Sequence, residues 1–281
     1  MRPEQSDIDA RLRLLTEAGI DAQILRLQNV SGVDAFPPAE GLELAQAANE
    51  EIAGIAKRHP QRFIPYASVP MRDINMAVGE LERAVKTLGH RGVGVSVSVD
   101  GVPLDHPRFA PFIDAVAQLD VPLILLPNHP SLIDAELQPY GWLTGAFGFQ
   151  VDLSLVALRL ACAGTFERHP RLKVVLANLG GVFPFVLDRL DHYWQRMNAG
   201  TRPLPAAPRD VLRRYFVETA SAHPAAIRMT AEVIGVDRIV FGSDYPSFDF
   251  RRAIDSVRGC GLPPEQVEMI LRRNAQALLA A

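Results

Sequence analysis

The sequence predicts a parallel α/β fold of the (β/α)8 TIM-barrel type, and three observations support this prediction. Strand-like and helix-like segments alternate along all 281 residues. The strand-like segments are short, continuous apolar runs, which are typical of parallel strands buried on both faces. The length suits repeated βα units in a single domain of residues 1–281, because no linker or low-complexity tract interrupts the pattern. An open doubly wound sheet has the same local pattern, so periodicity alone leaves both topologies open.

In the first half of the chain, each predicted helix is followed by a predicted strand. Residues 8–18 form an amphipathic pattern that ends at Gly19, a residue typical of helix C-termini. The segments that follow alternate as a strand at 20–27, a helix at 42–58, a strand at 63–69, a helix at 75–88, a strand at 92–99, a helix at 111–119 and a strand at 121–126.

The second half of the chain continues the same alternation. It predicts a helix at 154–169, a strand at 173–177, a helix at 183–196, a strand at 215–219, a helix at 225–234, a strand at 238–241 and a helix at 264–280. Seven strands are therefore expected, and most of them precede a helix.

Composition excludes several classes of protein. The 29 Lys and Arg residues against 32 Asp and Glu residues give a net charge of −3, so we expect neither nucleic acid nor a membrane surface as a partner. Cys162 and Cys260 do not form a Cys-x-x-Cys pair, which excludes a disulfide framework and a thiolate zinc site. The N-terminus lacks an apolar signal stretch, and the longest apolar run, residues 121–127, is about a third of a membrane span. We expect a cytoplasmic protein.

Polar residues follow the predicted strands, and in parallel α/β folds the chemistry takes place at the carboxyl ends of the strands. The candidate site therefore comprises the residues at these ends: Gln28, Asn29, Pro70, Asp100, Asn128, His129, Asn178, Gly180, Gly181, Ser221, His223, Ser243, Asp244 and Tyr245.

Four local motifs occur in order along the chain. They are Ala-Gly-Ile-Asp-Ala-Gln at 18–23, Arg-His-Pro-Gln-Arg-Phe at 58–63 leading to Ala-Ser-Val-Pro at 67–70, Arg-His-Pro-Arg-Leu-Lys-Val at 168–174 leading to Ala-Asn-Leu-Gly-Gly-Val-Phe-Pro-Phe at 177–185, and Arg-Ile-Val-Phe-Gly-Ser-Asp-Tyr-Pro at 238–246. Together they resemble the amidohydrolase-related (amidohydrolase 2) group, which includes aminocarboxymuconate-semialdehyde decarboxylase, γ-resorcylate-type decarboxylases and pyrone-dicarboxylate lactonase. The resemblance extends from about Ile8 to the C-terminus.

This resemblance implies a distorted (β/α)8 barrel with one divalent metal ion, usually zinc. Its ligands in such proteins are a His-x-His or Glu-x-His pair on strand 1, a His ending strand 5 and an Asp ending strand 8, and a catalytic His ends strand 6. In this chain only seven residues precede Ile8, so strand 1 is missing from the pattern, either natively or because the sequence is a truncated form. The expected His of strand 5 falls on Leu126 and that of strand 6 on Asn178, while Asp244 remains. Since leucine cannot ligate a metal and a single carboxylate binds zinc poorly, we predict no metal and no other cofactor.

Three residues are candidates for catalysis. Asp244 suits a general base or proton shuttle, although it could instead cap the following helix or bind nearby backbone. His129, in a Pro-flanked loop, could supply an acid or base or could simply be solvated. The Asn178 amide cannot transfer protons but can hydrogen-bond a substrate oxygen. Glu218 is expected to be an interior or capping residue rather than a catalyst.

Four further residues are candidates for substrate binding. The resemblance implies that Arg189, at its spacing after the two glycines, binds a substrate carboxylate across a homodimer interface; the alternative is an ion pair with Asp188 or Asp191. The others are Ser221, His223 and Tyr245, which follow the last two predicted strands.

The sequence therefore predicts an amidohydrolase-fold enzyme, independent of metal, that acts on a small carboxylated cyclic, aromatic or dienoic compound by hydrolysis or decarboxylation. A homodimer is expected by resemblance. The alternative is a non-catalytic binding protein or a partner subunit of a related enzyme. A polar pocket that converges on Asp244, Asn178 and His129 would favour catalysis, whereas a site filled by Leu126 and Phe248 would favour the alternative.

Overall fold

A computed structural model describes residues 7–27, 32–197, 199–201, 204, 206–220 and 223–280. Its central feature is a series of parallel strands that follow one another in chain order: β1 (Gln23–Leu25), β2 (Phe63–Pro65), β3 (Val93–Ser96), β6 (Leu123–Leu126), β7 (Val174–Leu176), β8 (Tyr215–Glu218) and β9 (Ile239–Val240). A bridge between Ala67 and Val93 joins the β1–β2 pair to the other five strands. A doubly wound sheet would reverse its strand order at a switch point. The sequential order therefore confirms the barrel-type fold. A small antiparallel pair, β4 (Ser98–Val99) with β5 (Val102–Pro103), lies outside this series.

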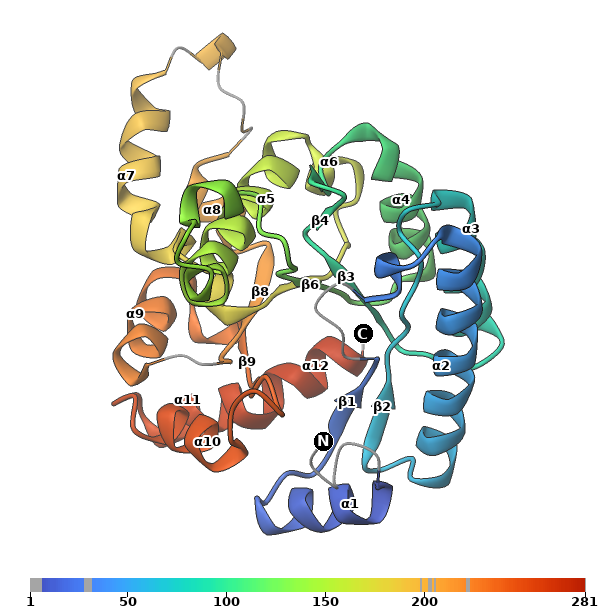
Figure 1. Cartoon of the computed structure of the whole chain (residues 1–281). Coiled ribbons are helices and arrows are strands. Elements are labelled where there is room, and N and C mark those ends of the chain that lie inside the picture. Colours follow the sequence, from blue (N-terminus) through green and yellow to red (C-terminus); the bar gives the residue numbers. More distant parts are fainter. Residues whose placement is uncertain are drawn as a thin grey trace.

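Helices surround the strands (Figure 1). They are α1 (Ile8–Glu17), α2 (Pro38–Arg58), α3 (Ile74–Lys86), α4 (Ala110–Leu119), α5 (Phe149–Cys162), α6 (Thr165–Arg168), α7 (Phe183–Arg196), α8 (Pro208–Leu212), α9 (Pro224–Ile234), α10 (Phe250–Arg258), α11 (Pro264–Glu268) and α12 (Asn274–Ala280). Most of them lie on the outer side of the strands, whereas α7 extends away from the body of the molecule (Figure 1).

Both faces of the strands are buried, which explains why the strands are continuous apolar runs. Leu123, Leu125 and Val217 belong to the large cluster that includes apolar side chains of the outer helices. The alternate residues Ile124, Val175, Phe216 and Val240 pack instead against Ala275 and Leu278 of α12. The α12 helix therefore packs on the face of the strands opposite the outer helices. In Figure 1 it runs between β9 and the β1–β2 pair.

Two helical predictions differ from the structure, and the helices α8 and α10 were not predicted. The helix expected at 154–169 is two helices, α5 and α6, because Gly164 adopts a left-handed conformation with φ 72° between them. The helix expected at 264–280 contains a π-helical segment, Met269–Arg273, between α11 and α12. The α10 helix was not predicted, although Asp249 caps its N-terminus and its apolar residues recur at helical spacing.

The helical segment Thr144–Cys162 is long and apolar enough, by length and composition alone, to span a membrane. Charged and polar residues interrupt it, so it does not form one continuous apolar run. Leu153, Val156, Ala157 and Leu160 from this segment pack in the main core. This packing is typical of a core helix in a barrel.

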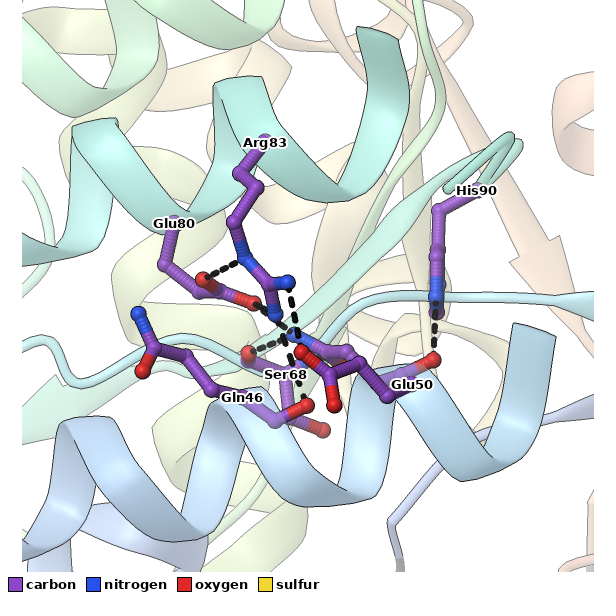
Figure 2. A network of polar contacts seen from close by, with 7 residues as sticks. Gln46, Glu50, Ser68, Glu80, Arg83 and His90 are labelled. Atoms are coloured by element: carbon purple, nitrogen blue, oxygen red, sulfur yellow. Dashed lines mark hydrogen bonds and ion pairs between the residues drawn. The ribbon is translucent and has the colours of Figure 1, made fainter. Parts of the chain in front are cut away.

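A buried polar network fixes the segment after β2 to α2 and α3 (Figure 2). The Asn49 side chain donates to Ser68 O (3.0 Å) and Glu80 Oε1 (2.7 Å) and accepts from Ser68 N (3.0 Å). Arg83 donates to both carboxylate oxygens of Glu80 (2.8 and 3.0 Å), and the His90 Nε2 atom lies 3.0 Å from Asn49 O. Buried polar groups are stable only when they are paired, so this network fixes where the chain leaves β2.

Candidate functional site

The Glu218 carboxylate contacts the segments that follow three neighbouring strands, β7, β8 and β9. Its Oε1 atom accepts a hydrogen bond from Asn178 N, after β7, and its Oε2 atom accepts one from Ala220 N, after β8, both at 2.7 Å. The carboxylate lies against Gly242, after β9, so closely that a Cβ atom there would be 1.7 Å from Oε2. Glu218 thus lies in the barrel interior, as the sequence predicted.

Arg26, directly after β1, is a positive charge that acts on this carboxylate. Its Cδ atom lies 3.3 Å from the position that a Cβ atom of Gly94 would occupy, and Leu126 Cδ1 lies 3.3 Å from the same point. Burial lowers the pKa of Arg26, while the charges of Asp244 and Glu218 oppose that effect. Burial raises the pKa of Glu218 to about 7, despite the two backbone donors. The Arg26 guanidinium therefore interacts with the charges of Glu218, in the barrel interior, and of Asp244, after β9.

The turn after β7 depends on two glycines with positive φ, Gly180 (76°) and Gly181 (69°), a conformation that glycine adopts without steric cost. A Cβ atom at Gly181 would lie 2.1 Å from Gln150 O. Ser154 holds the turn, because its Oγ atom donates to Gly180 O (3.2 Å) and accepts from Val182 N (2.8 Å). As a result, α5 packs directly against the segment that carries Asn178.

A cavity of about 430 Å³ opens beside this turn. Apolar side chains form much of its wall, and polar side chains are placed at separate points. Among its lining residues are Asn178, Gln150, His223, Thr230, Met229 and Phe248. A cavity of about 150 Å³ can hold a benzene ring, so this one has room for a substituted ring.

Three predicted site residues line the cavity, namely Asn178, Gly181 and His223. Asn178 has a positive φ of 51°, and its backbone N–H is fixed by Glu218. His223 is the N-cap of α9, where its Nδ1 atom accepts a hydrogen bond from Ala225 N (3.2 Å). In the neutral ring this bond places the proton on Nε2, so that Nε2 can donate to a bound molecule.

Two of the predicted catalytic residues lie elsewhere among the described residues. Asp244, with φ 52°, is exposed after β9 and does not line the cavity. Its pKa is raised because the surrounding protein removes water from it, while Arg26 and a hydrogen bond from Ser247 act in the opposite direction. His129 is also exposed, in the loop after β6, and is not among the cavity residues. The structure therefore does not bring Asp244, Asn178 and His129 to one pocket.

Tyr245 lies in an apolar cluster rather than in the cavity. Its ring stacks on Phe250 with centroids 4.4 Å apart, and the Arg11 guanidinium carbon lies 4.5 Å from its centroid. Both contacts belong to the region where α1 and α10 pack. Ser221, with Gln28 and Asn29 of the candidate site, lies outside the described residues.

Arg189 is exposed on α7, where its guanidinium carbon lies 5.5 Å from the Tyr193 ring centroid. Asp188 and Asp191, the two carboxylates considered as alternative partners, each form an ion pair with Arg209. The Arg189 guanidinium therefore lies on the protein surface and not in the described cavity.

A parallel barrel with a cavity and ionisable groups at the carboxyl ends of its strands is the arrangement of barrel enzymes. The family model described as Amidohydrolase (Amidohydro_2) matches residues 1–280, so this chain belongs to the amidohydrolase-related family. The resemblance predicted from the sequence motifs is confirmed.

The relatives of this chain include decarboxylases of aromatic acids. Gamma-resorcylate decarboxylase from Rhizobium radiobacter is 33% identical over 286 residues, covering 96% of this chain and 86% of that protein. The structure of 2,6-dihydroxybenzoate decarboxylase complexed with 2,6-dihydroxybenzoate has a TM-score of 0.91 and 29% identity, covering 98% of this chain and 89% of that one. A dihydroxybenzoic acid decarboxylase from Polaromonas, with bound manganese and the inhibitor 2-nitroresorcinol, has a TM-score of 0.90 and 30% identity, covering 98% and 86%.

These structures correct one prediction from the sequence. We predicted no cofactor, yet the Polaromonas enzyme and other decarboxylases of this fold contain manganese. The family therefore uses a divalent metal, and the expectation of no cofactor is wrong.

The described part of this chain does not offer a complete set of ligands for such a metal. Within those residues, no three His, Cys, Asp or Glu side chains lie together in a way that could hold an ion. Leu126 ends β6 and the neutral Asn178 follows β7, while the Arg26 guanidinium already faces Asp244. A cation beside a carboxylate disfavours a second one by like-charge repulsion.

Reasoning from the sequence missed Arg26, Ser154 and Thr230. Arg26 sits one residue after a strand, which is a signal that could have been used. Ser154 and Thr230 lie on α5 and α9, and their contribution depends on how helices pack against strand ends. No pattern of spacing in the sequence indicates that either residue lies near Asn178.

Proposed function

We propose that this chain is a decarboxylase of a small aromatic carboxylic acid. The observation that carries the proposal is the cavity of about 430 Å³ at the carboxyl ends of β7 and β8, lined by Asn178 and His223. The family membership and the γ-resorcylate decarboxylase relative support it. A pocket with an apolar wall and a few polar groups suits a planar ring with oxygen substituents.

In the proposed reaction, the bond between the ring carbon and the carboxylate carbon breaks and carbon dioxide leaves. A proton is added to that ring carbon and takes the electron pair of the broken bond, so the products are the arene and carbon dioxide. The residues must therefore orient the acid and deliver one proton. We assign orientation to the Asn178 amide and to His223 Nε2, whose hydrogen-bonding direction follows from the cap on α9.

We assign delivery of the proton to Asp244, which follows β9 and faces the Arg26 charge. Because Asp244 is exposed and does not line the cavity, the proton would reach the ring by way of an intervening molecule or after a local movement of its loop. No step is assigned to His129, which is exposed in the loop after β6 and does not line the described cavity.

The proposed function is tested with 2,6-dihydroxybenzoate, by measuring resorcinol and carbon dioxide in parallel reactions with and without added manganese. Formation of resorcinol supports the proposal, and Asp244→Asn should reduce it by about 10²-fold or more. Asp255→Asn, at an exposed position of α10, is the matched control and should leave the rate unchanged. Absence of product in both conditions, from this acid and from other hydroxybenzoates, would refute decarboxylation.

One observation favours the alternative of a non-catalytic binding protein. Asp244 and His129 do not line the described cavity, so the pocket could bind a ring without turning it over. Tight binding of 2,6-dihydroxybenzoate without product in either condition would support this alternative.

We also propose a homodimer that forms through α7 and the neighbouring loop. Phe185 (76% exposed) and Tyr193 (58%) project from α7, and Trp142 (73%) projects from the segment before α5. Large exposed aromatic side chains are typical of protein interfaces. A dimer mass by light scattering supports the proposal, and Phe185→Glu should shift it to a monomer. A monomeric wild type at micromolar concentration would contradict it.

A further inference from the structure

Arg26 is a charged residue at the carboxyl end of β1 that lacks a close partner of opposite charge. Its Nη1 atom donates to Leu27 O at 3.0 Å, which is the only hydrogen bond of its side chain with the described residues. Among those residues no carboxylate oxygen lies within 4.0 Å of its nitrogen atoms, and the charges of Glu218 and Asp244 act on it from a greater distance. Arginine side chains inside proteins are normally paired, so this guanidinium retains the capacity to bind an anion.

The unused donors of Arg26 are accessible to a small molecule. Arg26 is only partly buried, and its Nε and Nη2 atoms make no hydrogen bond within the described part of the chain. They differ in this from Arg62 Nε and Arg238 Nε, which are both unpaired and without accessible surface. Nε and Nη2 form the edge of a guanidinium that binds a carboxylate through two parallel hydrogen bonds. A bound acid can therefore reach the edge of Arg26 that suits it.

Arg26 lies at the end of the barrel where the polar strand ends meet. A Cβ atom on Gly94 of β3 would be 3.3 Å from Arg26 Cδ and 3.7 Å from its Nε, and 3.3 Å from Leu126 Cδ1 at the end of β6. Glu218, whose charge acts on Arg26, accepts the hydrogen bond from Asn178 N, and Asn178 lines the cavity. Enzymes with a parallel barrel bind their substrates at this end of the strands. Arg26 is therefore placed to contact a substrate.

The described cavity does not supply a charged partner for the carboxylate of an aromatic acid. Its lining residues include neither lysine nor arginine, and apolar side chains such as Met229 and Phe248 form much of its wall. A carboxylate that leaves water needs strong compensation, and a guanidinium matches its planar shape. The cavity thus suits the ring of the acid, whereas Arg26 suits its carboxylate.

We propose that Arg26 binds the carboxylate of the aromatic acid and holds this reacting group beside Asp244. The inference rests on the proposed function, because it takes the ligand to be an acid that loses its carboxylate. The charges of Arg26 and Asp244 already act on each other, so a carboxylate at Arg26 lies near the group to which we assign delivery of the proton. The proton then has a short path to the ring carbon, although Asp244 does not line the described cavity.

The acidic groups around Arg26 are compatible with a bound carboxylate. Two ionised carboxyl groups would weaken the binding of a third by repulsion. Removal of water by the surrounding protein raises the pKa of Asp244, and burial raises the pKa of Glu218 to about 7. Both groups therefore take up a proton more readily than they would in water. A protonated Asp244 removes part of the repulsion and carries the proton that the reaction requires.

The experiment measures equilibrium binding of 2,6-dihydroxybenzoate and resorcinol to the full chain by titration calorimetry. The two probes share the ring and both hydroxyls and differ only in the carboxylate. In Arg26→Met we expect the dissociation constant for 2,6-dihydroxybenzoate to rise about 10- to 100-fold, because hydrogen bonds to a charged group are lost. The constant for resorcinol should change less than about 2-fold. Each variant is compared with the wild type in the same buffer, with and without manganese, so that any contribution of the metal to affinity is measured separately.

Arg214→Met is the matched control. Arg214 is also partly buried, donates to one backbone carbonyl, Pro170 O at 2.7 Å, and forms no ion pair with the described residues. It directly precedes β8, at the amino end of the strands, so its replacement should leave both dissociation constants unchanged. Arg26→Gln can still donate to Leu27 O and should show the same selective loss as Arg26→Met, so it provides the test if the methionine variant does not fold. Arg26→Lys keeps the charge without the paired donors and should give an intermediate constant for the acid.

The outcomes separate this inference from the proposed function. Equal weakening of both probes, or no change for either, in a folded Arg26→Met or Arg26→Gln variant would overturn the role of Arg26 while leaving the proposed function in place. If the wild type binds neither probe, both the proposed function and this inference fail. Selective loss of 2,6-dihydroxybenzoate binding in the variants, together with no turnover by the wild type, would support Arg26 as the carboxylate-binding residue and reject decarboxylation.

Discussion

Replacing Gly242 by alanine tests whether Glu218 holds the strand ends as described. The new Cβ atom would lie 1.7 Å from Glu218 Oε2, 2.7 Å from its Cδ and 3.2 Å from its Cβ. Real Cβ contacts are essentially never shorter than 3.0 Å, so Oε2 must retreat by about 1.3 Å. The hydrogen bond from Ala220 N to this oxygen is 2.7 Å long, and a retreat of that size is enough to break it.

The expected cost has two parts. Overpacking a filled site typically costs about 1–3 kcal/mol, and leaving a buried N–H without its acceptor costs about 1–3 kcal/mol more. We therefore expect Gly242→Ala to lower the free energy of unfolding by about 2–5 kcal/mol. Because Glu218 also fixes Asn178 N, we expect turnover of the aromatic acid to fall as well.

Urea unfolding followed by circular dichroism measures this cost. Gly79→Ala is the matched control, because Gly79 is exposed in α3 and a Cβ atom there would meet nothing within 4 Å. That variant should gain about 0.5–1 kcal/mol from the higher helix propensity of alanine. In a Glu218→Ala background the conflict with the carboxylate disappears and only the 3.2 Å contact with Cβ remains, so the same substitution should cost less than about 1 kcal/mol. An equal cost in both backgrounds, or no cost at all, would refute the position assigned to Glu218.

Three further predictions concern buried polar groups. Burial lowers the pKa of His90, so the native state holds fewer protons than the unfolded chain below about pH 6.5. The free energy of unfolding should therefore fall as the pH decreases through that value. His90→Gln should flatten this pH dependence of the free energy of unfolding. Asn49→Ala removes three hydrogen bonds to Ser68 and Glu80 and should cost about 3 kcal/mol or more in urea unfolding; a loss below about 1 kcal/mol would contradict the network. Asp152→Ala removes the acceptor of Leu132 N, at 3.1 and 3.2 Å, and should cost about 1–3 kcal/mol and increase hydrogen exchange at residues 131–134.

The fold could be predicted from the sequence because local signals and global topology agree. Each strand is buried on both faces, so its apolar run is visible without knowledge of its neighbours. The predicted strand at 20–27 is shorter in the structure, Gln23–Leu25, because only those residues pair with β2. The break at Gly164 also had a local signal, since glycine is the residue that adopts positive φ most readily.

The site could be predicted only in part, for a physical reason. Strand ends are recognisable in a sequence, so Asn178 and His223 were identified, and both line the cavity. The remainder of the wall comes from helices and loops, and their side chains meet the cavity only after tertiary packing. Thr230 and Gln150 are separated by 80 positions in the chain and belong to different helices, so no local pattern connects them.

Glycines, which have no side chain, determine where charged side chains fit inside the barrel. Ile124, Val175 and Phe216 form one interior layer, in register across three strands, and α12 covers it with Leu278. Two positions further along β6 and β8, the same face carries Leu126 and Glu218. Gly94 and Gly242 leave room there for Arg26 and Glu218, because a Cβ atom at either glycine would approach one of these two side chains. Charges are stable in a partly buried layer only when they face one another, so the two glycines are a condition for keeping ionisable groups at this end of the barrel.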